Sequence, residues 1–356
     1  MSTRVFASKP AIALPPHEIT LAEILADIKH HHSDHPDLVR IGRVVGRVGV
    51  KSRRFTRPLN TVSQIVGTGP DEEPIGVRNA RAYRDVCELA VQATASLLDE
   101  QGISPTSIDA VVTSHSSGIA MPGVDVHLLN TFDMRPDVRR VPATQLGCVA
   151  GAHCLVRAAD MVRAHPGSTV LVVVAEALST AYLHTDDSLD AMIYKALFGD
   201  SGGAILVSDR PLGPGIEIHD TWEYTLPNTT HRYRSHLDHL GHHFESTSEA
   251  LLSVGELVPP MLEWYHQRDP EPPAFWVAHT GGPRILDDLA KATGCAPDAL
   301  QHSWNSLRER GNVGGNAVFD VLHRTYAAPP QDGASGVLIG LGPGFSAAAA
   351  RITWSN

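Results

Sequence analysis

Short β-rich runs alternate with helical stretches along the chain, and this alternation constrains the fold more than any other feature. Ala110–His115 and Thr169–Ala175 are apolar runs of strand length, and an amphipathic stretch, Leu155–Arg163, precedes the second run. Alternation of this kind is typical of proteins in which helices pack against a buried sheet. The sequence therefore predicts a layered α/β fold.

Loop signals divide this pattern into two parts. The densest one is Asp209–Gly215, rich in proline and glycine, so we place a boundary there and predict two α/β halves, 1–209 and 210–356. In the first half we also expect a helix over 19–30, which Thr20 can cap, and a longer one over 79–101 that ends at Gly102. In the second half we expect the strand Phe275–Ala278, the helix Arg284–Thr293 and the strands Gly336–Leu341 and Ala347–Trp354.

Composition excludes several functional classes. No apolar stretch approaches the roughly 20 residues of a membrane span, and no basic flank with an apolar core marks a secretory signal. The net charge of −10 argues against a nucleic-acid partner. The four cysteines include no CxxC pair, so we expect a reducing, cytoplasmic location and neither a disulfide framework nor a zinc knuckle.

One cysteine is a candidate nucleophile. Cys148 lies in Gln145–Gly151, where an extended segment turns into a helix, and small neighbours leave room for a substrate. Amide groups at a helix N-terminus favour an anion, so we expect a lowered thiol pKa there. The alternative is that Cys148 is a buried small apolar residue, the commonest role of a free cysteine.

Two further turns contain groups that could assist a thiol. His279 follows an apolar strand and precedes two glycines, while Asn312 lies in a turn of small residues before a helix. A nucleophile, an acid/base and an amide donor would together suit covalent catalysis. A lone histidine is nevertheless more often structural than catalytic.

These segments resemble the type III polyketide synthases, the chalcone-synthase-like branch of the thiolase superfamily. Seven motifs occur in order from about residue 51 to the C-terminus: Met121–Gly123, Gln145–Cys148, Glu176, Leu197–Asp200, His279–Pro283, Gly311–Asn312 and Gly340–Gly344. The resemblance implies a thiolase-like fold of two similar halves in α-β-α-β-α layers. It also implies a catalytic triad of Cys148, His279 and Asn312.

The resemblance further implies a reaction. The thiolate of Cys148, paired with the imidazolium of His279, would take an acyl group from an acyl-CoA. Malonyl-CoA would then lose carbon dioxide, and His279 and Asn312 would stabilise the resulting enolate in the manner of an oxyanion hole. The extended chain would finally cyclise. No metal or organic cofactor is expected, and family members are homodimers in which the methionine matching Met121 reaches the neighbouring site.

Coenzyme A is a polyanion, so an acidic protein needs a local basic entrance. Lys51, Arg53 and Arg54, followed by Arg57, form the strongest basic cluster, and Arg284 lies just beyond the turn of His279. The resemblance places the CoA phosphates near these residues. A solvated positive surface is the alternative.

The resemblance also implies a substrate cavity, and this chain departs from the family at its wall. Val313–Gly315 stands where Met-Ser-Ser is common, Thr280 replaces proline, and Leu341 replaces phenylalanine. Extra cysteines that line the cavity of tetrahydroxynaphthalene-forming relatives match serine and alanine here, which argues against that product. The expected cavity residues are Ser116, Met121, Leu178, Ala181, Ile216, Phe244, Gly314, Gly342 and Pro343.

Two questions stay open. His236, His239 and His243 could share a helical face and suggest zinc, but no cysteine or clear acidic ligand completes the set, so we predict no metal site. Alternative functions are a β-ketoacyl-[acyl-carrier-protein] synthase III-like enzyme and a catalytically silent partner that binds acyl-CoA. The intact triad argues against the silent partner.

Overall fold

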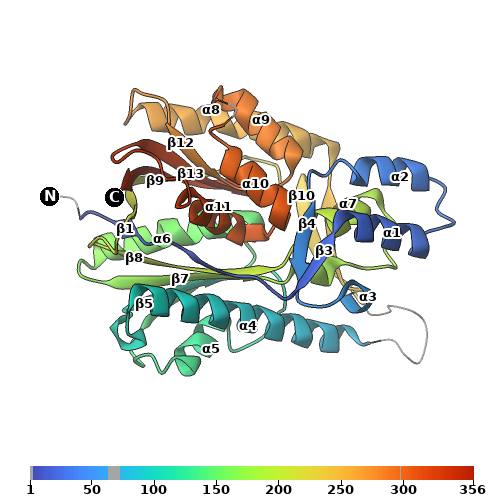
Figure 1. The fold of residues 1–356 in the computed structure, drawn as a ribbon, viewed down its shortest axis with the longest axis horizontal. Helices are drawn as coiled ribbons and strands as arrows, with labels where there is room; N and C mark the ends of the chain where they lie inside the picture. Colours follow the sequence, from blue (N-terminus) through green and yellow to red (C-terminus); the bar gives the residue numbers. More distant parts are fainter. Residues whose placement is uncertain (1–2, 63–72, 297) are drawn as a thin grey trace.

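The computed structural model describes residues 3–62, 73–296 and 298–356. Figure 1 shows five layers in the order helix, sheet, helix, sheet, helix. The α-helices are α1 (Leu21–His31), α2 (Leu38–Val45), α3 (Leu59–Val62), α4 (Ile75–Gln101), α5 (Val124–Thr131), α6 (Ala150–Ala164), α7 (Leu189–Leu197), α8 (Ser253–His266), α9 (Pro283–Thr293), α10 (Gln301–Arg310) and α11 (Ala317–Thr325). The strands are β1 (Phe6–Ala7), β2 (Ala11–Ala13), β3 (His17–Thr20), β4 (Ser52–Phe55), β5 (Ala110–Ser114), β6 (Arg139–Pro142), β7 (Thr169–Glu176), β8 (Ser201–Ser208), β9 (Gly215–Thr225), β10 (Tyr233–Leu237), β11 (His242–Ser246), β12 (Phe275–Ala278), β13 (Ser335–Gly342) and β14 (Ser346–Ser355).

The strands of both sheet layers belong to one continuous mixed sheet, which contains strands from both halves of the chain. Its strand order is β12-β13-β14-β9-β1-β8-β7-β5-β6, and β2 pairs with β8. The short strand β1 joins the halves, because Phe6 lies opposite Ser208 of β8 and Glu217 of β9. The boundary predicted near residue 209 therefore falls between two strands that both pair with the N-terminal segment.

Side-chain alternation on β7 explains the layers. Val170, Val172 and Val174 pack in the cluster that contains α6 and α11. Their neighbours, of which Leu171 and Val173 are examples, face the opposite way and pack against α4 and α5. Because every residue from 170 to 176 is buried, β7 is apolar on both faces from Val170 to Ala175 rather than alternating. The outer helices α8 and α9 cover the second half in the same way.

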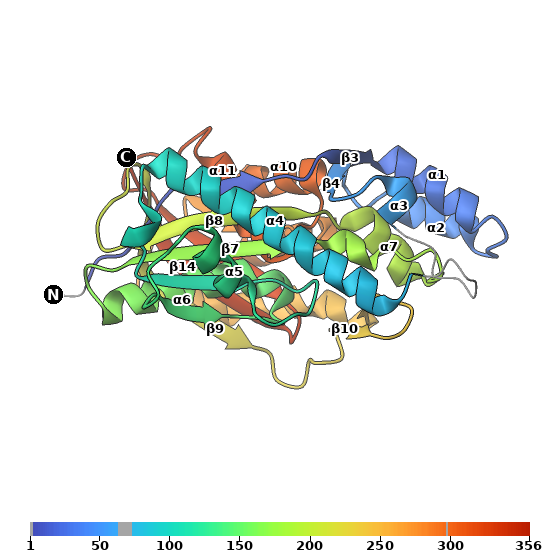
Figure 2. The same ribbon diagram turned by 90° about the horizontal axis from the view of Figure 1, so that it is seen from below.

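Most predicted elements are present. Thr20 ends β3 and caps α1, accepting a hydrogen bond from the amide of Glu23 at 3.2 Å. Figure 2 shows the long helix α4 across one face, and this helix ends at Gly102 in the left-handed conformation. None of the described helices is long and apolar enough to cross a membrane.

The helix considered for the histidine-rich segment is wrong. Residues 233–246 form an antiparallel hairpin, β10–β11, in which His236 lies opposite His243. Side chains in this segment therefore alternate between the two sides of a strand. His239 lies in the connecting turn, outside both strands. The hairpin forms part of a cavity wall, described next.

Candidate active site

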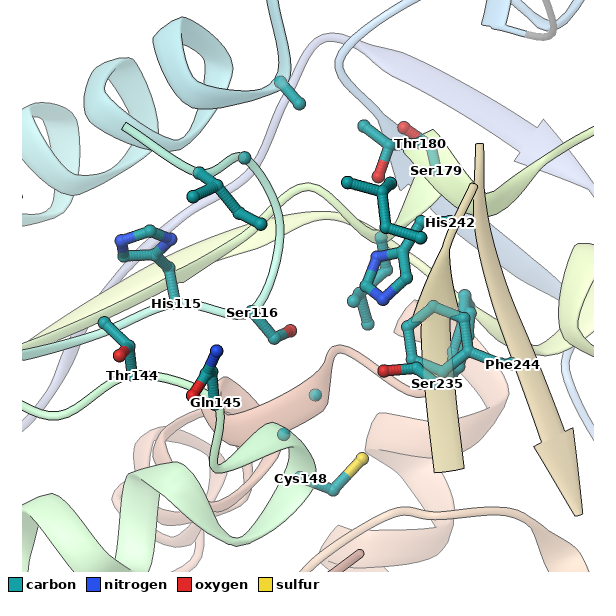
Figure 3. Close-up of a pocket in the computed structure, with 18 of the residues that line it drawn as sticks. His115, Ser116, Thr144, Gln145, Cys148, Ser179, Thr180, Ser235, His242 and Phe244 are labelled. Carbon is teal, nitrogen blue, oxygen red and sulfur yellow. The ribbon is translucent and has the colours of Figure 1, made fainter. Parts of the chain in front are cut away.

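A cavity of about 900 Å³ contains the three predicted catalytic residues among its lining. Cys148 lies in the 3-10 turn just before α6, His279 directly follows β12, and Asn312 lies in the connection between α10 and α11. Figure 3 shows the Cys148 sulfur pointing into this space, toward the hairpin that carries Ser235 and Phe244. Residues separated by more than 160 positions thus meet at one site.

The turn before α6 presents the thiol. Gln145 and Gly147 adopt positive φ angles of 64° and 57°, and the 3-10 turn Gly147–Val149 leads directly into α6. Behind this turn, a Cβ on Gly151 would lie only 2.1 Å from the carbonyl oxygen of Gly315. The absence of a side chain at Gly151 therefore allows the helix start to approach the segment after Asn312.

Backbone bonds fix the position of Asn312. Its N–H donates to the carbonyl of Leu197 at 2.8 Å, and its carbonyl accepts from the N–H of Gly199 at 3.0 Å. Gly311 has a φ of 72°, and a Cβ there would lie 2.3 Å from the Leu197 oxygen. Glycine is therefore required before the asparagine. The motif 197–200 holds the backbone of Asn312 through these two hydrogen bonds.

The Asn312 amide lies beside the thiol. Its Nδ2 is 3.7 Å from Cys148 Sγ and 3.4 Å from the carbonyl oxygen of Gly281, to which it donates. Its Oδ1 accepts from the N–H of Gly314 at 2.9 Å. These two backbone partners assign the oxygen and nitrogen of the amide, so an N–H donor faces the sulfur.

The resting charge state differs from the sequence expectation. Burial raises the pKa of the Cys148 thiol to about 12, although the hydrogen bond with Asn312 opposes this shift. Burial also lowers the pKa of His279 to about 3. The expectation of a lowered thiol pKa is therefore wrong for this state, because loss of water outweighs the helix start. The unliganded site holds a thiol and a neutral imidazole.

His279 is placed by strand pairing. Its N–H donates to the carbonyl of Ile339 on β13 at 2.9 Å, and its ring Nδ1 is buried without a hydrogen-bond partner among the described residues. With the ring in the cavity lining, a neutral His279 can accept a proton from a thiol.

A buried carboxyl group supports the cavity wall. Glu176 is fully buried, and its Oε2 accepts from both the N–H and the hydroxyl of Ser116, at 3.1 and 2.7 Å. Burial is the main cause that raises its pKa, to about 7. A Cβ on Gly314 would lie 3.0 Å from the Glu176 side chain, so Glu176 occupies the space behind that glycine.

Seven of the nine expected cavity residues line it: Ser116, Met121, Leu178, Phe244, Gly314, Gly342 and Pro343. Two assignments are wrong. Ile216 lies on β9 with 1% exposure, inside the central apolar core, because β9 is an interior strand of the sheet. Ala181 ends a 3-10 turn, Leu178–Ala181, whose residues 178–180 line the cavity while Ala181 does not.

The basic cluster also needs correction. Arg53 is fully buried and donates to the carbonyl of Ala196, so it cannot contact a phosphate in solvent. Strand alternation on β4 is the reason, since Arg53 and Phe55 face inward. Lys51, Arg54 and Arg284 lie outside the cavity lining, and Arg54 and Arg284 pair with Glu18 and Asp288. Their role toward coenzyme A stays a prediction.

Sequence reasoning missed several lining residues. The arginines that it missed are Arg78, Arg81, Arg140 and Arg234, whereas Arg57, which also lines the cavity, belongs to the basic cluster noted in the sequence. Polar residues missed include His115, Thr144, Gln145, Thr180, Ser235 and His242. Gln145 and His115 belong to segments already singled out, so these segments could have identified them. His242 belongs to the histidine-rich segment before Phe244, and its orientation depends on the hairpin.

Comparison with known proteins gives one consistent answer. The family model for the N-terminal domain of chalcone and stilbene synthases matches residues 43–211, and the C-terminal one matches 217–352. A 1,3,6,8-tetrahydroxynaphthalene synthase of Streptomyces griseus is 31% identical over 351 residues, covering 98% of this chain and 92% of that protein. A phloroglucinol synthase of Pseudomonas fluorescens is 30% identical over 349 residues, covering 97% and 98%.

The fold agrees with these sequence matches. The structure of germicidin synthase from Streptomyces coelicolor, a type III polyketide synthase, superimposes with a TM-score of 0.93 at 31% identity, covering 99% of this chain and all of that one. A five-layer α/β fold and a cavity that unites the three predicted residues accompany this similarity. The chain therefore belongs to the chalcone and stilbene synthase family and is a type III polyketide synthase with a thiolase-like fold.

Proposed function

We propose that this enzyme loads an acyl-CoA starter on Cys148 and extends it with malonyl-CoA, or a substituted malonyl-CoA, by decarboxylative Claisen condensation. The chain would then cyclise to a pyrone or phenolic product. The observation that carries the proposal is the meeting of thiol, imidazole and amide in one cavity of about 900 Å³.

Each of the three groups has a distinct role in this scheme. Neutral His279 accepts and keeps the thiol proton as the sulfur attacks the thioester carbonyl, and coenzyme A leaves as a thiolate that takes a proton from solvent. In the second step, malonyl-CoA loses carbon dioxide and the enolate oxygen accepts hydrogen bonds from His279 and from Asn312 Nδ2. Because these steps use only the chain's own groups, we propose no resident cofactor for them.

Arginine side chains in the cavity lining support a polyanionic substrate. Arg57 belongs to the basic cluster noted in the sequence and reaches the lining, where it also pairs with Asp85 at 2.8 Å. Guanidinium groups suit phosphate oxygens. We therefore propose Arg57 as a CoA-phosphate contact, alongside the earlier candidates Lys51, Arg54 and Arg284.

We also propose a homodimer in the cytoplasm. Met121 and Ile119 both line the cavity, yet they are 97% and 68% exposed in the single chain. Large apolar side chains this exposed are candidates for a subunit interface. All four cysteines are free, in keeping with a reducing compartment.

The test combines acylation mapping with a substrate comparison. Purified enzyme is incubated with acyl-CoA, digested and mapped by mass spectrometry, and Cys148 should be the only acylated cysteine. An adduct on Cys87, Cys154 or Cys295 with Cys148 free would reject the assignment. Product formation from radiolabelled malonyl-CoA is then measured with and without acyl carrier protein. Product only in the presence of the carrier protein would favour a synthase III-like enzyme. No product under either condition would favour a silent partner.

A further inference from the structure

The β10–β11 hairpin forms part of the cavity wall. In its register, Ser235 lies opposite Phe244 and Leu237 opposite His242, and all four residues line the cavity. Successive side chains on a strand point to opposite sides. The intervening pair, His236 and His243, lies on the alternate side of the strands, and of these two only His236 is also among the cavity-lining residues.

Three potential metal ligands gather around this pair. One ligand atom from each of His236, Asp238 and His243 lies within 4.8 Å of the others. The two imidazole rings are nearly parallel, with centroids 5.0 Å apart, and His243 Nε2 is 3.1 Å from Asp238 Oδ1. Side-chain exposures of 49% for His236, 37% for Asp238 and 11% for His243 leave access from solvent. The acidic ligand that the sequence did not reveal is thus Asp238.

A second carboxylate orients the most buried ligand. His243 Nδ1 lies 2.7 Å from Oδ2 of Asp186, which belongs to the segment before α7. With its proton on Nδ1, His243 directs the Nε2 lone pair toward Asp238. A carboxylate behind a histidine is the usual support of a metal-binding imidazole. Backbone N–H groups of Leu240 and Gly241 donate to Asp238 Oδ1 at 2.8 and 3.1 Å, which fixes this carboxylate as well.

We propose that His236, Asp238 and His243 bind a divalent transition-metal ion of the Zn²⁺ type, with Asp186 as the positioning residue for His243. Two imidazole nitrogens and one carboxylate oxygen match the ligand preferences of Zn²⁺, with water in the remaining position. Metal binding replaces any proton on His243 Nε2, which is released to solvent. The bound ion bridges both strands at the pair His236–His243. It therefore stiffens the hairpin, which forms part of the cavity wall.

A second group of similar composition is less suitable. Asp27, His31 and His184 also lie within ligand distance of one another. Asp27 Oδ2, however, already accepts from the Tyr182 hydroxyl at 2.6 Å and contacts His184 Nε2 at 2.9 Å. The rings of His31 and His184 are in close stacking contact, with centroids 3.6 Å apart against 5.0 Å for His236 and His243. This group serves as the internal control.

Zn²⁺ alone is titrated into the full-length, tag-free enzyme, and binding is measured by calorimetry. We expect one equivalent to bind, with His236→Ala and Asp238→Asn each weakening affinity at least 10-fold. Asp186→Asn should weaken it by roughly 10- to 100-fold, the usual effect of a supporting carboxylate. The matched controls are His239→Ala, which removes an adjacent histidine outside the group, and His31→Ala in the second group. Both should bind as the wild type does.

A second measurement tests the stiffening. Hydrogen exchange of amides in residues 233–246 should slow at least several-fold when Zn²⁺ is added to the wild type, and should not change in His236→Ala. The proposal is overturned if no Zn²⁺ binds, if His236→Ala and Asp238→Asn bind normally, or if His31→Ala abolishes binding. Unaltered exchange in a Zn²⁺-bound enzyme would overturn the stiffening. Neither readout depends on the condensing activity, so failure here leaves the proposed function intact.

Discussion

The side-chain amide of Asn312 lies 3.7 Å from the sulfur of Cys148, although 164 positions separate the two residues in the chain. The amide is fixed by the backbone at Gly281 and Gly314, and the sulfur by the turn before α6. Both are therefore positioned before substrate arrives. Such preorganised donors are effective because they need no reorganisation during reaction.

Asn312 has no ionisable group, so its contribution should fall on the enolate step. We expect Asn312→Ala to retain acyl loading on Cys148 and to lose malonyl-CoA decarboxylation by on the order of 100-fold or more, as for one oxyanion-hole donor. His279→Ala should impair both steps, since His279 also accepts the thiol proton. The paired measurement is burst acylation by mass spectrometry and carbon dioxide release. Loss of acylation with normal decarboxylation in Asn312→Ala would contradict this division of roles.

Glu176 should make stability depend on pH. Its pKa rises from an ordinary value of 4.5 to about 7 in the fold, so between these values the folded chain binds more protons than the unfolded chain. The free energy of unfolding therefore falls as pH rises through this window, by up to about 3 kcal/mol for this group. Glu176→Gln keeps an acceptor for Ser116 and should abolish that dependence.

Urea denaturation of both proteins at pH 5 and pH 8 measures the effect of Glu176. The variant should gain stability relative to the wild type on going to pH 8. If the free energies of unfolding of variant and wild type differ by the same amount at pH 5 and at pH 8, Glu176 does not titrate in this range.

Phe244 should limit the size of the starter. Its ring packs against Phe198 and His242, with centroids 5.0 and 4.5 Å away, and it lines the cavity. Phe244→Ala should shift the ratio of kcat/KM toward longer acyl-CoA starters, since each methylene accommodated in an apolar pocket is worth roughly 1–3 kcal/mol. Ile216→Val is the control: it should cost about 0.5–1.5 kcal/mol of stability and leave the starter profile unchanged. A changed preference among acyl-CoA starters in Ile216→Val would show that Ile216 lines the cavity.

Two arginines of the same cluster should behave differently. Arg57→Gln should raise KM for acyl-CoA about tenfold, the effect of losing one charge-assisted hydrogen bond, with kcat nearly constant. Arg53→Met should leave KM unchanged, because Arg53 is buried beside Ala196. Steady-state kinetics at low salt provide the comparison. A raised KM in Arg53→Met alone would reverse the two assignments.

Local chemistry determined what the sequence could specify. The strands β7 and β12, the end of α4 at Gly102 and the capped start of α1 follow from periodicity and cap residues within a few positions. Short motifs at the ends of elements made Cys148, His279 and Asn312 candidates, and the resemblance to the type III polyketide synthases joined them as a predicted triad. The layered α/β class followed from the same alternation.

Tertiary structure decided which side chains face the cavity and which charges they carry. Arg53 and Ile216 point inward because of their phase on paired strands, and that phase depends on partners far away in the chain. The raised pKa of Cys148 and the lowered pKa of His279 arise from burial, which no local motif encodes. Likewise, Asp238 joins His236 and His243 only because a hairpin turn reverses the chain between them. Local propensities act over a few residues, whereas orientation and desolvation are properties of the packed molecule.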